Sequence, residues 1–128
     1  MLDVGMVYTN YQVIDEIGKV RGIGSRCQIP YSKEQLLVDL MTFHFRLMRR
    51  STYEQVGGID SSFQWADDYD LCLKISEVTQ IHHLPRLLYL YRCHSDNMTN
   101  SLEKKLAIEV GTLQTTYPEA EIQLWLVW

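Results

Sequence analysis

The chain has 128 residues, of which 46% are hydrophobic and 22% charged, and its formal net charge at pH 7 is −4. These values fit one globular domain, and the acidic balance argues against the broad basic surface that binds nucleic acid. The chain contains no apolar run of the roughly 18 residues that a membrane span needs, no basic secretory n-region and no C-x-x-C pair, so we expect a cytoplasmic protein with reduced cysteines.

The first half of the chain alternates between strand and turn signals before a helix. Residues 4–15 are rich in β-branched and aromatic side chains and predict a strand. Residues 16–32 carry three glycines and a proline, which predicts a turn and loop that return as a hairpin. Ser32, followed three residues later by Gln35, forms a capping-box pattern and predicts a helix up to Met41.

The second half continues the alternation. Residues 42–50 predict a strand in which Phe43, Phe45 and Leu47 form the buried side, while His44 and Arg46 share the polar side. The next patterns predict a short helix over 51–58 that ends at its glycines, and a second helix over 67–78. Residues 81–94 predict a strand, a proline corner and a second strand. An amphipathic helix over 99–114 and an apolar strand-like tail over 121–128 complete the predicted elements. Alternating strands and helices indicate an α/β layer fold.

The stretch "QWADDYDL" places three carboxylates, Asp67, Asp68 and Asp70, at the start of a helix. Acids in a first turn stabilise a helix by about 0.3–1 kcal/mol each, so helix initiation is the simplest explanation. At about 100° per residue, however, Asp68 falls on the apolar stripe, whereas Asp70 and Lys74 fall on the solvated face. A carboxylate on the buried face needs a cleft or a partner, which makes Asp68 a candidate for acid–base chemistry.

The same geometry argues against a metal site made by this stretch alone. Asp68 and Asp70 match D-x-D, but on a helix their side chains project about 200° apart and cannot share one ion. The following residues also lack the glycine that an EF-hand loop requires.

Three segments carry a family resemblance: "VYTNYQVIDEIGKV", "FRLMRRSTYEQVGGIDSSFQWADDYDLCLKI" and "LPRLLYLYRCHSDNMTNS". In order and spacing they resemble the second, acceptor-side half of family-2 glycosyltransferases of the GT-A fold, over about residues 4–101. The resemblance implies a partial GT-A-like mixed sheet flanked by helices. It also implies an acceptor-side and catalytic-base half over residues 1–100, followed by a C-terminal helix and apolar tail over 101–128.

The resemblance implies a reaction and a base. Such enzymes transfer a sugar from a nucleotide-sugar donor to an acceptor hydroxyl with inversion, often to build polysaccharide. Asp68 stands where the family has its catalytic aspartate, and Asp67 replaces the preceding glutamate. We therefore expect Asp68 to act as the general base, with Asp67 and Asp70 in supporting positions.

Other residues receive roles from the resemblance, each with a simpler alternative. Gly57 and Gly58 would form a tight turn beside the acceptor, or Gly57 would only end a helix. Trp65 would stack on a sugar, or would pack in the core. Arg92 and His94 would approach the donor diphosphate or its metal, or His94 would be a structural histidine. His44 and Arg46 have no role beyond the rim of a cleft.

The family's nucleotide-binding half, with its metal-binding D-x-D, has no counterpart in these residues. We therefore expect an incomplete transferase with little or no activity alone, and a divalent cation, Mg or Mn, only in the complete enzyme. Expected partners are a nucleotide-sugar, a saccharide acceptor, and either a missing N-terminal half or a second copy of the chain, with a cytoplasmic location that includes the cytoplasmic face of a membrane.

Two competing hypotheses stay open at this point. The chain is either a non-catalytic carbohydrate- or protein-binding remnant of such an enzyme, or an unrelated small α/β domain whose acids only cap a helix.

Overall fold

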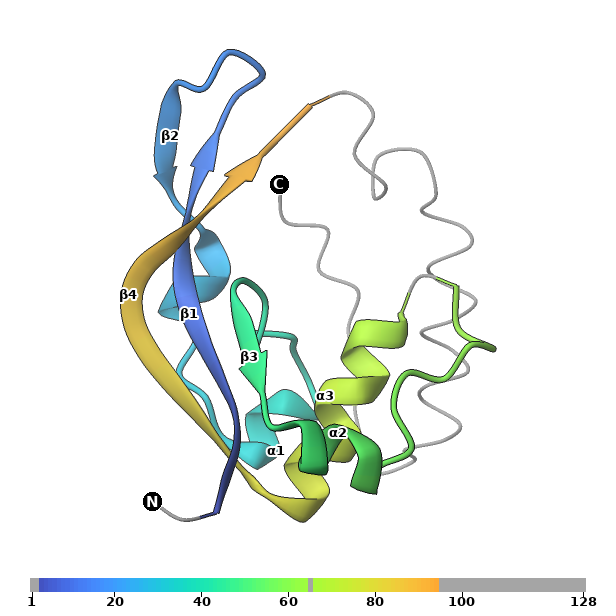
Figure 1. The fold of residues 1–128 in the computed structure, drawn as a ribbon. Coiled ribbons are helices and arrows are strands. Elements are labelled where there is room, and N and C mark those ends of the chain that lie inside the picture. Colours follow the sequence, from blue (N-terminus) through green and yellow to red (C-terminus); the bar gives the residue numbers. More distant parts are fainter. Residues whose placement is uncertain (1–2, 65, 95–128) are drawn as a thin grey trace.

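The computed structural model describes residues 3–64 and 66–94, which form a sheet with helices on one side of it (Figure 1). The elements in chain order are β1 (Val4–Ile14), β2 (Val20–Ile23), a 3-10 helix η1 (Ser25–Gln28), α1 (Lys33–Leu36), β3 (Arg46–Met48), α2 (Arg50–Gln55), α3 (Asp67–Val78) and β4 (Gln80–Arg92).

The sheet is built around β1. One edge of β1 pairs in parallel with β4 from Val4 to Ile14, and the other edge pairs antiparallel with β3 near its start and with β2 near its end. The described part of the fold is thus a mixed sheet flanked by helices, as the sequence predicts, and the strand and hairpin predicted over its first residues are confirmed.

The last strand corrects one prediction. A proline corner between two strands is predicted, but β4 is one continuous, curved strand in Figure 1. Thr9 pairs with Leu84 and the next residue of β1 pairs with Leu87, so Pro85 and Arg86 bulge out of the ladder. Proline has no N–H to donate, and a bulge accommodates it without ending the strand.

The helix predicted from Ser32 to Met41 is much shorter in the structure. Ser32 caps it as expected, since its hydroxyl accepts a hydrogen bond from the Gln35 N–H at 2.9 Å. The helix ends at Leu36, however, and a turn over residues 37–38 leads to Asp39, whose carboxylate accepts the N–H of Leu40 at 2.8 Å. Asp39 therefore satisfies a backbone N–H outside the helix, where the apolar pattern still continues.

The buried side predicted for residues 42–50 is wrong. The strand β3 covers only Arg46–Met48, and Phe45 and Leu47 are exposed. Arg46 pairs with Tyr8 and Met48 with Met6, and directly paired residues share a face. Because Tyr8 and Met6 are almost fully buried, this register turns Arg46 and Met48 toward the core side.

The core lies between the sheet and α3. Met6, Tyr8 and Ile81 of the sheet pack with buried side chains of α1, α3 and the connecting loops, namely Leu36, Met41, Phe63, Ala66, Tyr69, Leu71, Cys72, Leu73 and Ile75. Both α2 and α3 form where the sequence predicts helices. The predicted helix over 99–114, the apolar tail and the proposed boundary after residue 100 lie outside the described residues.

Candidate active site at the start of helix α3

The first turn of α3 uses two of its acids to bind backbone N–H groups. The Asp67 carboxylate accepts the N–H of Asp68 at 3.0 Å, and the Asp68 Oδ1 accepts the N–H of Tyr69 at 2.8 Å. The N-cap residue, Ala66, makes no side-chain cap bond. These contacts satisfy N–H groups that a helix leaves free, so the acids do contribute to starting the helix.

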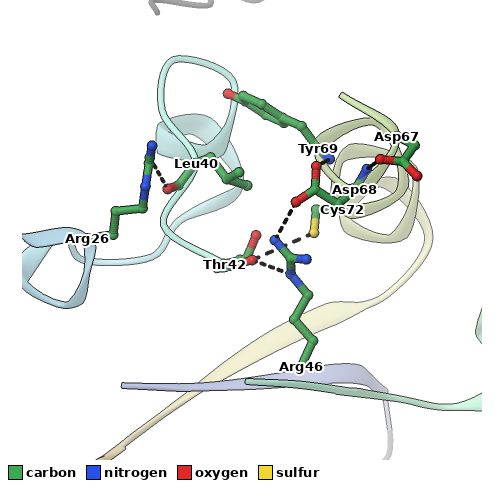
Figure 2. Close-up of polar contacts among 8 residues, drawn as sticks. All are labelled: Arg26, Leu40, Thr42, Arg46, Asp67, Asp68, Tyr69 and Cys72. Carbon is green, nitrogen blue, oxygen red and sulfur yellow. Dashed lines mark hydrogen bonds and ion pairs between the residues drawn. The ribbon is translucent and has the colours of Figure 1, made fainter. Parts of the chain in front are cut away.

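Asp68 has a second contact that helix initiation does not require. Its Oδ2 pairs with the Arg46 guanidinium of β3 at 3.1 Å, and the side chains are 38% and 18% exposed, respectively. Arg46 also donates from Nε to the carbonyl of Thr42, in the loop before β3. Its guanidinium therefore bridges this loop and α3 (Figure 2). A carboxylate held by an arginine from another element, and still partly open to solvent, is positioned to meet a ligand.

A group of aromatic rings lies next to this pair. His44 stacks on Tyr89 and Tyr91, with ring centroids 4.5 and 5.0 Å away, and its Nε2 is buried without a hydrogen-bond partner in the described part of the chain. Burial lowers the pKa of His44 to about 4; nearby Arg46 acts in the same direction and Asp68 opposes it. His44 is therefore a neutral ring at physiological pH.

Asp70 corrects the prediction of a solvated face. It is only 3% exposed, whereas Asp68 is the more open carboxylate. Asp70 pairs with Lys74 at 3.2 Å, and Lys74 Nζ also donates to the Gly58 carbonyl at 2.8 Å. The predicted i,i+4 pair thus exists, but the contact of Lys74 with the glycine turn shows that this side of α3 is packed against chain rather than solvated.

The glycine turn forms as expected. Gly57 and Gly58 have φ of 84° and 70°, and their N–H groups close the end of α2 on the carbonyls of Glu54 and Tyr53. The contact with Lys74 places Gly58 along the side of α3 that carries Asp70, roughly opposite Asp68. An acceptor-binding role for these glycines stays a prediction.

The structure places the predicted donor-side residues away from Asp68. Arg92 donates to the carbonyls of Asp15 and Glu16 in the β1–β2 turn, at 3.2 and 2.8 Å. Its partner on β1 is Ile14, six residues beyond Tyr8, the partner of Arg46. Six residues of strand span about 20 Å. Arg92 and Asp68 therefore do not form one cluster.

The roles predicted for His94 and Trp65 stay predictions. His94 is exposed just after β4. Trp65 lies outside the described residues.

The described residues hold no group of three or more His, Cys, Asp or Glu side chains that could bind a metal ion. These residues therefore do not fit the expected Mg or Mn ion, and we assign no catalytic step to a cation here. The ion expected for the complete enzyme stays a prediction.

Arg46 is the residue of the candidate site that the sequence placed only at the rim of a cleft. The sequence pattern that could have indicated Arg46 is its predicted place on the polar side of a short alternating strand. Alternation alone could not show which distant acid the guanidinium would meet, because that depends on the pairing of β3 with β1.

No protein-family model matches the sequence. Curated relatives do: the chain is 32% identical over 108 residues to a chondroitin synthase of Escherichia coli, a match that covers 84% of this chain and 15% of that protein. It is 30% identical over 103 residues to a hyaluronan synthase of Pasteurella multocida, covering 80% and 10%. It is also 28% identical over 111 residues to a glycosyltransferase of Rickettsia prowazekii, covering 79% and 34%.

These relatives are glycosyltransferases, and two are named for the polysaccharide that they make. The chain spans only 15% and 10% of the two synthases, so the similarity concerns one part of much longer enzymes. Among the helices of the described part, none is long and apolar enough to cross a membrane.

Proposed function

We propose that the chain is the acceptor-side, catalytic-base part of an inverting glycosyltransferase that builds polysaccharide, with Asp68 as the base. The observation that carries the proposal is the Asp68 carboxylate itself, fixed by Arg46 at 3.1 Å and still 38% exposed. The relatives support the reaction class, since two of them are polysaccharide synthases that match 84% and 80% of this chain.

In the proposed reaction, Asp68 acts on the acceptor hydroxyl. A carboxylate oxygen takes the hydroxyl proton while the acceptor oxygen attacks the anomeric carbon of the donor sugar. The new carbon–oxygen bond forms as the bond to the nucleoside diphosphate breaks, and the electron pair leaves with the diphosphate. Attack from the side opposite the leaving group inverts the anomeric carbon, and a positioned base of this kind contributes about 10²–10⁴-fold.

Arg46 serves the base by fixing its direction. The guanidinium donates from Nε to the Thr42 carbonyl and from Nη2 to Asp68 Oδ2. Asp68 Oδ1 is held by the Tyr69 N–H. A carboxylate anchored at both oxygens keeps one orientation, which reduces the cost of reaching the reactive geometry.

In this proposal, the nucleotide-sugar donor is bound by residues outside the described part of the chain. The two synthases are many times longer than the matched region, and the described residues provide no site for the cation expected beside the diphosphate. We therefore expect little or no transfer from the isolated 128 residues, with either the rest of a longer chain or a partner chain supplying the nucleotide-sugar.

A chimera tests the proposal. The matching segment of the Escherichia coli chondroitin synthase is replaced by this chain, and sugar transfer is compared between the chimera and its Asp68→Asn variant. We expect the variant to fold and to lose about 10²–10⁴-fold in kcat. Glu77→Gln, at an exposed position of the same helix, is the matched control and should keep full activity. An Asp68→Asn chimera that transfers sugar at close to the parent rate would refute the assignment.

A further inference from the structure

A cavity of about 250 Å³ lies between the β1–β2 hairpin and the end of β4, and it shares Tyr91 with the ring group around His44. Its walls include the rings of Tyr11, Phe43 and Tyr91, and its polar side chains are Arg21, Arg26 and Ser25. Cys93 also lines it. The cavity does not include Asp68 or Arg46, so it is a different place from the candidate active site.

The three rings form one continuous wall. Phe43 and Tyr91 lie 5.4 and 6.1 Å from Tyr11, and 5.7 Å from each other, measured between ring centroids. Gly24 packs against Tyr11 so closely that an added Cβ would meet the ring at 2.1 Å. The sequence thus keeps this residue small where the hairpin closes on the Tyr11 ring.

The charges around the cavity are already balanced. Arg26 lies over the Phe43 ring, donates to the Leu40 carbonyl at 2.8 Å and pairs with Asp39 at 3.4 Å. Arg21 pairs with Asp15 at 3.1 Å. Paired guanidinium groups attract a phosphate or diphosphate weakly, but they still offer N–H donors to neutral hydroxyl groups.

An apolar wall with a few hydrogen-bond donors is the surface that a sugar ring requires. A pyranose presents C–H groups on its faces and hydroxyl groups at its rim, and aromatic side chains contact the faces while polar groups bind the rim. The volume lies just below the range of whole-ligand pockets, which suits a single ring of a longer molecule.

The aromatic wall continues toward the candidate base. Phe43 and Tyr91 also contact His44, with ring centroids 4.0 and 5.0 Å from the imidazole centroid. Asp68 is in turn close enough to His44 to influence the pKa of the imidazole. Along β1, the cavity begins at Tyr11, three residues or about 10 Å beyond Tyr8, the partner of Arg46. A ligand that reaches both places must therefore be an oligosaccharide.

We propose that this cavity binds one pyranose ring of the acceptor polysaccharide, some distance behind the end that reacts at Asp68. The inference rests on the proposed function for the identity of the ligand, and the cavity supplies the subsite. It predicts that longer acceptors bind more tightly than short ones, because only they place a ring against Phe43 and Tyr91.

Protection of Cys93 from iodoacetamide tests the subsite without any transfer reaction. The 128-residue chain is alkylated with and without hexasaccharides of chondroitin, hyaluronan and cellulose at millimolar concentration, and each cysteine is followed by peptide mass spectrometry. At about ten times the Kd of a bound hexasaccharide, Cys93 should react about tenfold more slowly. Cys27, which does not line the cavity, should react at an unchanged rate.

Substitutions test whether the protection of Cys93 depends on the aromatic wall of the cavity. Tyr91→Ala should weaken the protection about tenfold, whereas Leu90→Ala, its exposed neighbour on β4, should leave it unchanged. Ile23→Trp, at an exposed position that lines the cavity, should block it even if Tyr91→Ala folds poorly. Asp68→Asn should leave protection intact, because the subsite lies apart from the base.

The outcomes separate the two proposals. If no hexasaccharide protects Cys93, or if uridine diphosphate protects it and the saccharides do not, the subsite inference is overturned even when the chimera transfers sugar. If saccharides protect Cys93 while Asp68→Asn leaves transfer in the chimera undiminished, the subsite stands and the assignment of the base fails.

Discussion

Replacing His44 with phenylalanine should remove a defined part of the pH dependence of folding stability. Histidine has a pKa near 6.5 in an unfolded chain. Burial, with the help of Arg46, lowers the pKa of His44 to about 4 in the folded protein. Between these values the unfolded state binds more protons than the folded state, so the stability contribution of His44 falls as the pH falls from about 6.5 and levels off near 4.

The size of the effect follows from the two pKa values. For a shift from 6.5 to about 4, linkage gives a loss of about 2 kcal/mol between about pH 7.5 and about pH 5. The ring is not completely buried, and solvent reduces the value, so we expect about 1–2 kcal/mol. Phenylalanine keeps a ring against Phe43 and Tyr91 but does not titrate, so the variant should lose that much less stability on acidification.

Urea unfolding at the two pH values, for the parent chain and His44→Phe, measures the difference directly. Burial also lowers the pKa of His83, but this group is present in both proteins and cancels in the comparison. At the higher pH the variant should be as stable as the parent or more stable, because it no longer buries an unpartnered ring nitrogen. Equal losses of stability on acidification in both proteins would refute the burial of a neutral His44.

Two further substitutions test the contacts around α3. Arg46→Met should lower the free energy of unfolding in urea by about 1–3 kcal/mol, because the Thr42 carbonyl and the Asp68 carboxylate lose their donor. Arg46→Lys should recover part of that stability. A loss smaller than the error of the method would show that the bridge contributes nothing. Gly58→Ala should lower the free energy of unfolding by about 1–2 kcal/mol or more, because φ is 70° and the new Cβ would meet the Tyr53 ring at 2.9 Å. An unchanged midpoint of urea unfolding would show that this turn can relax.

The elements that the sequence predicts correctly are those fixed by local chemistry. The β-branched run of β1, the Ser32 cap and the glycines after α2 act within a few residues, and each appears where expected. The elements that differ depend on distant partners. The inward face of β3 follows from pairing with Tyr8 and Met6, which alternation within residues 42–50 cannot reveal.

The candidate site shows the same division. Helix geometry predicted different faces for Asp68 and Asp70, but it assigned Asp68 to the buried face and Asp70 to solvent, and the structure shows the reverse: the side chains are 38% and 4% exposed. The pattern could not anticipate that the glycine turn would pack beside Lys74. Nor could it anticipate the Arg46 bridge, which joins residues 22 apart in sequence.

The contrast between these two acids is what singles out Asp68. Both pair with a cation at nearly the same distance, 3.1 Å for Asp68 and 3.2 Å for Asp70. The partner of Asp70 is one turn away in its own helix and the carboxylate side chain is 4% exposed, so this acid is closed to a substrate. The partner of Asp68 comes from β3, and 38% of the carboxylate side chain stays exposed. Asp68 therefore combines a direction fixed by the tertiary fold with access for an acceptor hydroxyl, and a general base needs both.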